Sequence, residues 1–457
     1  MTKEQEMDGE TVNQLLHEND IDTIKLGMVD IDGLWRGKRV TVDYFLNSII
    51  PKGAHICDII FGWDIQDKLI QGLKFTGWHT GYPDVFLVPD ISTIAIVPWE
   101  ERTASVICDV VDANGNPVAI SPRYVLRKIL NRMKEDELTP MVGYELEFYL
   151  LKETLQSLEQ KNYTDIEPLT RGPDCYSLYR GTRTEYIIGE LRRNMNKYGI
   201  IVDAANSEYG SGQFEVNLHY CPAMTAADRS LLFKIGIKEI ATIHDIFTTF
   251  MAKYNHDDAG SSAHVHQSIS DGSGKNLFSD GEGGLSVMAM HYLAGVIATL
   301  PEFMALYCPN INSYKRIVED SWTGINATWA RENRTTAVRT VVSSASATRI
   351  ENRIPGADAN PHIVIAACIA GGLYGMNEKL KSSEPTAGNA YELPDEDIPQ
   401  LPKSLESAIE VLYRSNIARD LLGSEFVDHF VATRSWEIQE YRKVVTDWER
   451  HRYLEMI

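Results

Sequence analysis

The sequence predicts an α+β protein, in which a small β-rich region at the N-terminus precedes a larger region that mixes strands with long helices. Short apolar runs separated by turns fill the first 115 residues. Beyond them, stretches of helical length and period alternate with short strand-like runs. The chain has 457 residues, of which 44% are hydrophobic, which is enough for a large core. We therefore expect two domains, at residues 1–115 and 116–457.

The N-terminal region has the pattern of a small sheet. Strands are expected at residues 23–31, 34–42, 84–97 and 104–111. Asp32 and Gly33 stand between the first two runs, and this dipeptide is a strong signal for a hairpin turn. The polar turn at residues 112–117 ends the β-rich region.

Helices are expected in the second region from both their caps and their period. Ser121 and Pro122 suit the N-cap and the first position of a helix that runs to about Glu135. Further helices are expected at residues 226–254, 284–307 and 404–415. Loops are expected at residues 255–260, 271–284 and 381–400.

Composition excludes several classes of partner. The formal net charge is −20, which argues against DNA, RNA or an anionic membrane as a partner. The apolar stretch at residues 363–374 is too short to span a membrane, and the first 20 residues lack the features of a signal peptide. The six cysteines are scattered without metal-binding spacing, which is typical of reduced thiols. We expect a cytoplasmic protein.

Four short segments alternate an apolar residue with an ionisable one. They lie at residues 143–150, 213–219, 264–268 and 349–353. Residues two apart share one face of a strand, so Glu145 lies with Glu147, and His264 with His266. Such strands are usually surface strands with one wet face. Here, however, the polar faces carry carboxylate, imidazole and guanidinium, which together favour one shared cavity.

The residue types on these faces indicate phosphoryl transfer. Carboxylates with one or two histidines suit Mg²⁺ or Mn²⁺, and Glu208 joins them through a glycine-containing loop. Arginines, which bind phosphate and carboxylate through two donors, are dense in residues 316–353. Metal ions and arginines in one cavity neutralise a migrating phosphoryl group. The sequence has no P-loop or dinucleotide-binding motif, so an ATP site here would be of another kind.

The order and spacing of these segments resembles the type I branch of the glutamine synthetase superfamily over nearly the whole chain. The motifs that carry the resemblance lie at residues 144–148, 208–215, 260–268, 312–316, 333–334, 349–353 and 360–361. The resemblance implies an N-terminal β-grasp-like domain and a catalytic domain with a curved antiparallel sheet flanked by helices. It also implies a ring assembly, usually a dodecamer, in which the N-terminal domain completes a neighbour's active site.

The resemblance also implies a role for each motif residue. One metal ion would be held on the glutamate side by Glu147, Glu208 and Glu215. A second would lie between the ATP phosphates, held by Glu145, His264 and Glu351. His266 and Ser268 would lie beside the nucleotide, while Arg334 and Arg339 would contact its phosphates and act in catalysis. The glutamate substrate would be bound by Arg316 and Arg353, with Gly260 nearby and Arg349 near the phosphates. The family makes γ-glutamyl phosphate from ATP and glutamate, and a nitrogen nucleophile then displaces the phosphate.

The sequence departs from glutamine synthetases at the nitrogen-acceptor site. Trp322 stands where those enzymes have a flap glutamate that binds ammonium, unless Glu319 or Asp320 supplies that carboxylate from a shifted loop. For the ammonium-binding aspartate of the N-terminal domain, Asp64 is our candidate and Asp58 is the rival. Two further departures, Ala259 and Ser262, alter the motif that precedes His264.

These departures favour an organic amine, alkyl or aromatic, as the second substrate, because Trp322 and Trp63 offer apolar area. The expected product is a γ-glutamyl amide, formed in amine catabolism. True glutamine synthetase activity and a glutamate–polyamine ligase are the alternatives. A non-catalytic relative should have lost metal ligands, and all six proposed ligands are present. Tyr391 lies in a segment that resembles the adenylylated loop of some bacterial glutamine synthetases, and we interpret it as an ordinary loop residue.

Overall fold

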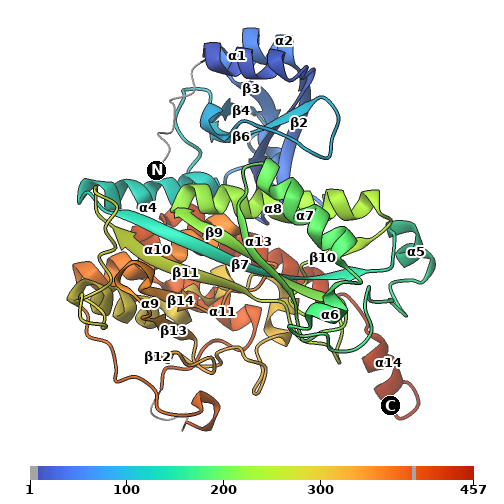
Figure 1. Cartoon of the computed structure of the whole chain (residues 1–457). Helices are drawn as coiled ribbons and strands as arrows, with labels where there is room; N and C mark the ends of the chain where they lie inside the picture. Colours follow the sequence, from blue (N-terminus) through green and yellow to red (C-terminus); the bar gives the residue numbers. More distant parts are fainter. Residues whose placement is uncertain (1–8, 394–397) are drawn as a thin grey trace.

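The computed structural model describes residues 9–393 and 398–457 and has the expected α+β class. A small sheet with short helices stands on top of a larger body that consists of a broad sheet and long helices (Figure 1). The division at residue 115 stays a prediction; the last strand of the small sheet ends at Val111, and the next helix begins at Pro122.

The small sheet has the order β2-β1-β6-β4-β3, and β5 pairs with β6. Its strands are β1 (Thr23–Val29), β2 (Trp35–Thr41), β3 (Ala54–Cys57), β4 (Asp84–Pro89), β5 (Ala95–Ile96) and β6 (Thr103–Val111). The predicted hairpin joins β1 to β2, and β1 runs parallel to β6. Helix α1 (Gly9–Glu18) buries Val12 and Leu16 in the core of this sheet. The short helices α2 (Val42–Tyr44) and α3 (Ile50–Lys52) follow β2.

The large sheet has the order β12-β13-β14-β11-β7-β9-β8, and β10 pairs with β7. Its strands are β7 (Thr139–Leu151), β8 (Val202–Ser207), β9 (Gln213–Pro222), β10 (Phe247–Thr249), β11 (Ala263–Ser270), β12 (Trp329–Arg331), β13 (Val338–Val341) and β14 (Arg349–Asn352). The four segments with alternating polarity are confirmed as β7, β9, β11 and β14. All the pairings are antiparallel except that of β12 with β13.

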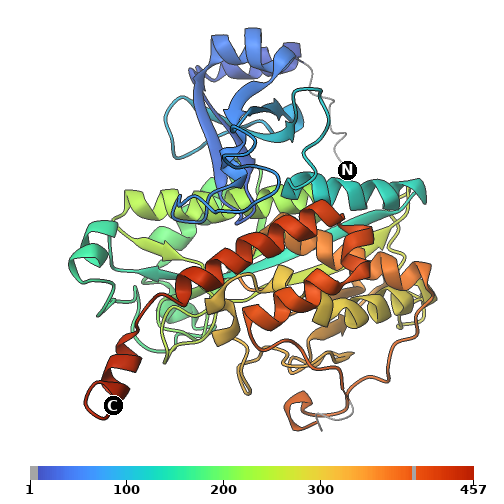
Figure 2. The same ribbon diagram turned by 180° about the vertical axis from the view of Figure 1, so that it is seen from behind.

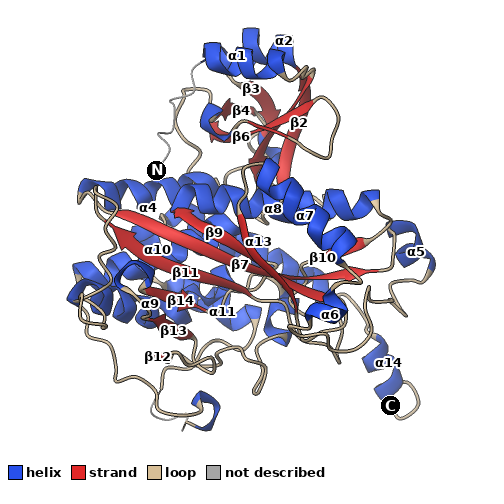
Figure 3. Ribbon diagram, viewed as in Figure 1, coloured by secondary structure: helices blue, strands red, loops and turns tan. Residues whose placement is uncertain are grey.

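Long helices flank this sheet (Figure 3). The helices of the larger body are α4 (Pro122–Glu135), α5 (Leu155–Gln160), α6 (Leu178–Gly181), α7 (Glu185–Lys197), α8 (Ala223–Ile243), α9 (Val287–Tyr307), α10 (Pro361–Asn377), α11 (Leu405–Arg414), α12 (Asn416–Leu421), α13 (Ser424–Tyr441) and α14 (Asp447–Tyr453). Helices α4 and α8 contact β7, and α10 packs on α4, α8 and α9. Seen from behind, α13 crosses the body and α14 extends away from it (Figure 2).

The alternation of side chains divides the two faces of the large sheet. Tyr144, Leu146 and Phe148 of β7 lie in the main hydrophobic core with Val216 of β9 and Val265 of β11. The ionisable residues of the same strands consequently point to the opposite face. Burial of the apolar face fixes the register of each strand, because a slip by one residue would place the charged side chains in the core.

Two sequence-based boundaries were wrong. The helix expected at residues 226–254 ends at Ile243, because the chain turns at Asp245, where φ is +55°, and Phe247–Thr249 then pairs with β7. The strand expected at residues 84–97 ends at Pro89, where the Asp90 side chain caps a short 3-10 helix, Ile91–Thr93.

Helix α9 is the one described helix that is long and apolar enough to cross a membrane, by length and composition alone. The sequence analysis considered only the apolar stretch at residues 363–374, which lies in α10. The structure packs α9 against α10 and α11, and its Leu293, Leu300 and Phe303 are fully buried. A helix at the centre of a large core has the same apolar composition as a membrane span.

A buried ion network joins the small sheet to the helices. Arg123 of α4 is 1% exposed and donates hydrogen bonds to Asp90 (2.6 Å), Asp109 (2.7 Å) and Asp228 (2.9 and 3.1 Å). His362 Nε2 of α10 lies 2.8 Å from Asp228 Oδ1. Burial alone would raise the pKa of Asp228, but the charge of Arg123 and the hydrogen bonds from His362 and Arg123 lower it to about 2.

We expect Arg123→Met to lower the free energy of unfolding by ~3–5 kcal/mol, because it leaves buried carboxylates without a cation. The measurement is denaturant unfolding at neutral pH. Since the pKa of folded Asp228 lies below its usual 3.8, this contribution should be present above that value and lost as the pH falls through about 2. Arg132→Met, on the same helix but in an exposed pair with Asp420, is the control and should cost ~1 kcal/mol or less. Equal losses in the two variants would contradict the role of the network.

Candidate active site

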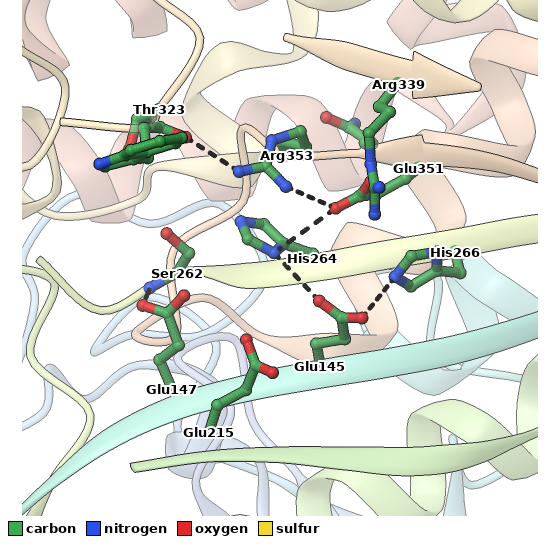
Figure 4. Close-up of polar contacts among 12 residues, drawn as sticks. Glu145, Glu147, Glu215, Ser262, His264, His266, Thr323, Arg339, Glu351 and Arg353 are labelled. Carbon is green, nitrogen blue, oxygen red and sulfur yellow. Dashed lines mark hydrogen bonds and ion pairs between the residues drawn. The ribbon is translucent and has the colours of Figure 1, made fainter. Parts of the chain in front are cut away.

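The register of the large sheet brings the predicted ionisable residues together on its polar face (Figure 4). His264 lies opposite Glu145, and Glu147 lies opposite Glu215. On the other side of β11, Glu351 lies opposite His266. Three separate strand pairings therefore converge on one cluster, which explains why residues far apart in the sequence meet here.

One group of possible metal ligands consists of Glu145, His264 and Glu351, whose ligand atoms all lie within 4.8 Å of one another. His264 Nδ1 is 3.2 Å from Glu145 Oε2 and 3.6 Å from Glu351 Oε1. Burial raises the pKa of Glu351, but the charges of His266, Arg353, His264 and Arg339 lower it to about 2. The pKa of Glu145 is also lowered, because the charge of His266 and the hydrogen bonds from both histidines outweigh its burial.

A second group consists of Glu147, Glu215 and the same His264, again within 4.8 Å of one another. Burial raises the pKa of Glu147 to about 7, although the Ser262 backbone N–H donates a hydrogen bond (2.7 Å) to its carboxylate. Burial and the charges of Glu145, Glu147 and Glu208 raise the pKa of Glu215 to about 8. For Glu147, the charges of Arg316 and Arg353 lower the pKa by less than burial and the charge of Glu208 raise it.

Glu208 lies beside this second group rather than within it. Its carboxylate accepts hydrogen bonds from Asn206 Nδ2 (3.0 Å) and Tyr209 N–H (3.2 Å), and burial raises its pKa. Its charge acts on Glu147 and Glu215. The sequence grouped Glu208 with those two residues, whereas the structure places His264 between them and the first group. All six predicted ligands therefore lie in one region, and their assignment to metal ions stays a prediction.

Two predicted arginines orient around Glu351. Arg339 Nε donates to Glu351 Oε2, and its Nη1 donates to Glu332 (3.1 Å). Arg353 Nη1 donates to Glu351 Oε1 (2.7 Å), and its Nη2 donates to the carbonyl oxygen of Trp322 (3.0 Å). Glu351 thus fixes both guanidinium groups at the edge of the cluster.

Arg316 is buried behind the second group. Its Nη1 donates to Ser262 Oγ (3.1 Å) and Thr323 Oγ1 (3.2 Å), and its Nη2 donates to the Ile354 carbonyl oxygen. Among the described residues, the buried Nε atoms of Arg316 and Arg353 have no hydrogen-bond partner. Gly260 lies against Arg316, since a Cβ at this position would come within 2.3 Å of Arg316 Cγ. The site therefore has two buried guanidinium donors available for an anionic ligand.

The predicted nucleotide residues lie toward the other end of the cluster. His266 Nε2 is 2.8 Å from Glu145 Oε1, and Arg349 Nε donates to His266 Nδ1 (3.0 Å). Ser268 follows on the same face of β11 and is half-buried. Arg334 lies in an exposed turn between β12 and β13. The nucleotide roles of these residues stay predictions.

Asp64 and Asp58 both lie in the N-terminal region. The Asp64 carboxylate accepts hydrogen bonds from the N–H groups of Gln66 (2.8 Å) and Lys68 (2.9 Å), and from Trp436 Nε1 (3.1 Å) of α13. Asp58 is buried and accepts a hydrogen bond from Thr76 (2.8 Å). Within the described part of this chain, no hydrogen bond or ion pair joins either residue to the carboxylate cluster. Their proposed reach into a neighbouring subunit stays a prediction.

Trp322 lies in the segment at residues 317–324, which follows Arg316. Its side chain is 64% exposed, and its φ is +60°, in the left-handed region that bulky residues rarely adopt. Glu319 and Asp320 are also exposed. The structure brings the Trp322 carbonyl within hydrogen-bonding distance of Arg353, and the role of the Trp322 side chain stays a prediction.

Tyr176 was not among the predicted site residues. Its backbone N–H donates to the carbonyl oxygen of Ser207 (3.1 Å), the residue before Glu208. Partial burial raises its pKa, and so do the charges of Glu208 and Glu215. It is 71% exposed and has a φ of +55°. The residue lies in an irregular loop before α6, where neither a period of two nor a period of 3.6 residues could have revealed it.

Comparisons with known proteins agree with this geometry. Residues 119–453 match the family model described as glutamine synthetase, catalytic domain. The chain is 45% identical over 448 residues to a glutamate–isopropylamine ligase of Pseudomonas sp, covering 98% of both chains. It is 35% identical to a gamma-glutamylethanolamide synthetase of Streptomyces coelicolor, covering 98% of this chain and 95% of that protein. A solved structure titled GmaS/ADP complex superimposes with a TM-score of 0.85 at 27% identity, covering 97% of this chain and 99% of the other. The chain belongs to the glutamine synthetase family.

Proposed function

We propose that the protein is an ATP-dependent ligase that joins the γ-carboxylate of L-glutamate to the nitrogen of an organic amine, through γ-glutamyl phosphate. One observation carries the proposal. The carboxylates, histidines and arginines that phosphoryl transfer requires share one sheet face, while the segment held over Arg353 presents Trp322 instead of a flap carboxylate. The names of the two relatives, which act on isopropylamine and form an ethanolamide, support an organic amine.

The carboxylate clusters fit divalent cations, Mg²⁺ or Mn²⁺. Glu147 and Glu215 have raised pKa values because they are buried close together, and a cation between them would relieve that repulsion. Glu208 would join Glu147 and Glu215 as a ligand of one ion. Glu145, His264 and Glu351 would hold a second ion. When bound, such ions neutralise the charge on the phosphates of ATP and on the transferred group.

The arginines would bind the two anionic substrates. Arg316 and Arg353 each have a buried Nε–H that finds no partner among residues 9–393 and 398–457, which suits the carboxylates of glutamate, near Gly260. Arg339 is oriented by Glu351 and would contact the ATP phosphates together with Arg334 and Arg349. His266 and Ser268 would lie beside the nucleotide. With the acceptor end of glutamate held in this way, the protein positions the phosphoryl donor and acceptor in line.

The acceptor pocket would use aromatic side chains. Trp322 and Tyr176 are both exposed, and their backbones are held by Arg353 and by the residue before Glu208, so their rings would cover the carbon skeleton of an amine. A polyamine would require additional carboxylates around its second ammonium group, which makes an amine with an apolar skeleton the better fit.

We also propose that the protein assembles into rings, as a dodecamer, in which the N-terminal region of one subunit completes the site of the next. Asp64, or its rival Asp58, would then approach the incoming amine from the neighbour. The position of both residues in the N-terminal region, outside the carboxylate cluster of their own chain, is consistent with such an arrangement.

The direct test is phosphate release with glutamate, ATP, Mg²⁺ and a panel of isopropylamine, ethanolamine, putrescine and ammonium. We expect kcat/KM for the best organic amine to exceed that for ammonium by at least about tenfold, because burial of an apolar skeleton adds binding that ammonium cannot make. The γ-glutamyl amide should appear in equal amount to phosphate. An equal kcat/KM for ammonium would favour true glutamine synthetase activity, with Glu319 or Asp320 as the flap carboxylate.

Trp322→Glu should shift the preference toward ammonium. Loss of the indole contact should lower kcat/KM for an apolar amine by roughly tenfold to a hundredfold, while ammonium loses no such contact. Val318→Glu, at another exposed position of the same segment, is the matched control for the added charge. A variant that loses both activities in equal proportion would show that Trp322 supports the segment and does not contact the amine.

Glu215→Gln should raise the thermal stability of the metal-free protein at neutral pH, because folding raises the pKa of the buried Glu215 carboxyl to about 8 and so opposes its ionisation, a cost that the amide does not carry. The same variant should gain less stability from added Mg²⁺ or Mn²⁺ than the wild type, and should lose nearly all activity. Thermal unfolding with EDTA and with each metal measures both effects. Glu159→Gln, on the exposed surface of α5, is the control. A metal-dependent stabilisation equal to that of the wild type would remove Glu215 from the ligand set.

A further inference from the structure

Three hydrogen bonds hold Trp322 and Thr323 in place. Arg353 Nη2 donates to the Trp322 carbonyl oxygen (3.0 Å), and Arg316 Nη1 donates to Thr323 Oγ1 (3.2 Å). The third contact comes from a distant part of the chain, where the Tyr391 hydroxyl donates to the Thr323 carbonyl oxygen (3.0 Å). Figure 4 shows Arg353 between Glu351 and the segment that carries Thr323. The first two contacts belong to arginines of the site, whereas the third does not.

Hydrogen bonds to three other residues fix the segment that carries Tyr391. The Gly388 carbonyl oxygen accepts a hydrogen bond from Asn333 Nδ2 (2.7 Å). The Ala390 carbonyl oxygen accepts one from Asn326 Nδ2 (3.1 Å), and the Ala390 N–H donates to Thr335 Oγ1 (2.9 Å). Asn326 is buried, and Ala390 is fully buried. The backbone just before Tyr391 is therefore held in place, and this fixes the position from which its side chain extends.

The segment that receives this hydrogen bond contains two residues in an unfavourable backbone conformation. Asp320 and Trp322 both have positive φ, at 58° and 60°, and neither is a glycine. Residues in this region of conformational space persist only where surrounding contacts impose it. Within the segment, Ser321 Oγ donates to the carbonyl oxygens of Arg316 (3.3 Å) and Val318. Thr323 is buried, whereas Trp322 just before it is 64% exposed. The contacts at Trp322 and Thr323 therefore contribute to where the indole lies.

We propose that Tyr391 is a positioning residue for the second substrate, because its hydroxyl holds the Thr323 carbonyl oxygen, one residue after the Trp322 carbonyl that Arg353 binds, and so shapes the acceptor pocket. The inference rests on the proposed function. It also gives Tyr391 a role inside its own subunit, in place of that of an ordinary loop residue. Trp322 and Thr323 would also help to keep water away from γ-glutamyl phosphate, so their displacement should let water compete with the amine.

Tyr391→Phe is the test, since it removes the hydroxyl and keeps the ring. We expect KM for the best amine of the panel to rise about threefold to tenfold, with kcat and KM for ATP within about twofold of the wild type. Phosphate released without amide should rise as a fraction of total phosphate. Tyr413→Phe, at an exposed position in α11 whose hydroxyl has no described partner, is the control and should match the wild type.

A double-mutant cycle separates positioning from general support. In a Trp322→Ala background, Tyr391→Phe should no longer change KM for the amine, because there is no indole left to position. If the Phe variant does not fold, Thr335→Val loosens the base of the same segment and should give the same pattern. An unchanged KM and an unchanged ratio of phosphate to amide would overturn the proposal, as would equal increases in KM for all three substrates. The proposed function itself fails in a different way, if the wild type uses no organic amine.

Discussion

The crowding of buried carboxylates on one face of the large sheet is the constraint on which the rest of the site depends. Side-chain alternation places Glu145 and Glu147 on the same face of β7, and strand register then adds Glu215 and Glu351 from two other strands. These charges cannot be avoided by a shift of register, because the opposite face of each strand is part of the core. The protein must therefore neutralise them where they are.

Neutralisation is complete in one half of the face and incomplete in the other. Glu351 lies between Arg339 and Arg353, and its pKa is about 2, so the chain itself supplies the opposite charge. In the part of the chain that the structure describes, no guanidinium lies within hydrogen-bonding distance of Glu147 or Glu215, and their pKa values rise to about 7 and 8. An asymmetry of this kind would leave the second half dependent on an external cation, and it couples occupation of the site to stability.

Sequence reasoning recovered the features that have a period or a local signal. Alternation identified β7, β9, β11 and β14 with their polar faces, and Ser121 with Pro122 located the start of α4. The end of α8 was missed because the turn at Asp245 contains neither glycine nor proline. Tyr176 and the contact from Tyr391 to Thr323 were missed because both arise from irregular segments. The network at Arg123 includes a contact with Asp228, more than 100 positions away in the sequence, and no local sequence pattern predicts such a contact.

The same distinction separates phosphoryl transfer from the choice of amine. Phosphoryl transfer depends on strands whose register is enforced by the core, so its geometry changes little when loops change. The acceptor pocket that we propose depends instead on the segment at residues 317–324 and on the loop of Tyr176, which lie outside the sheet and where Trp322 and Tyr176 have positive φ. Such segments accept substitutions at little cost to the fold. If the proposal holds, a different side chain at position 322 would alter the choice of nucleophile without moving a strand of the sheet.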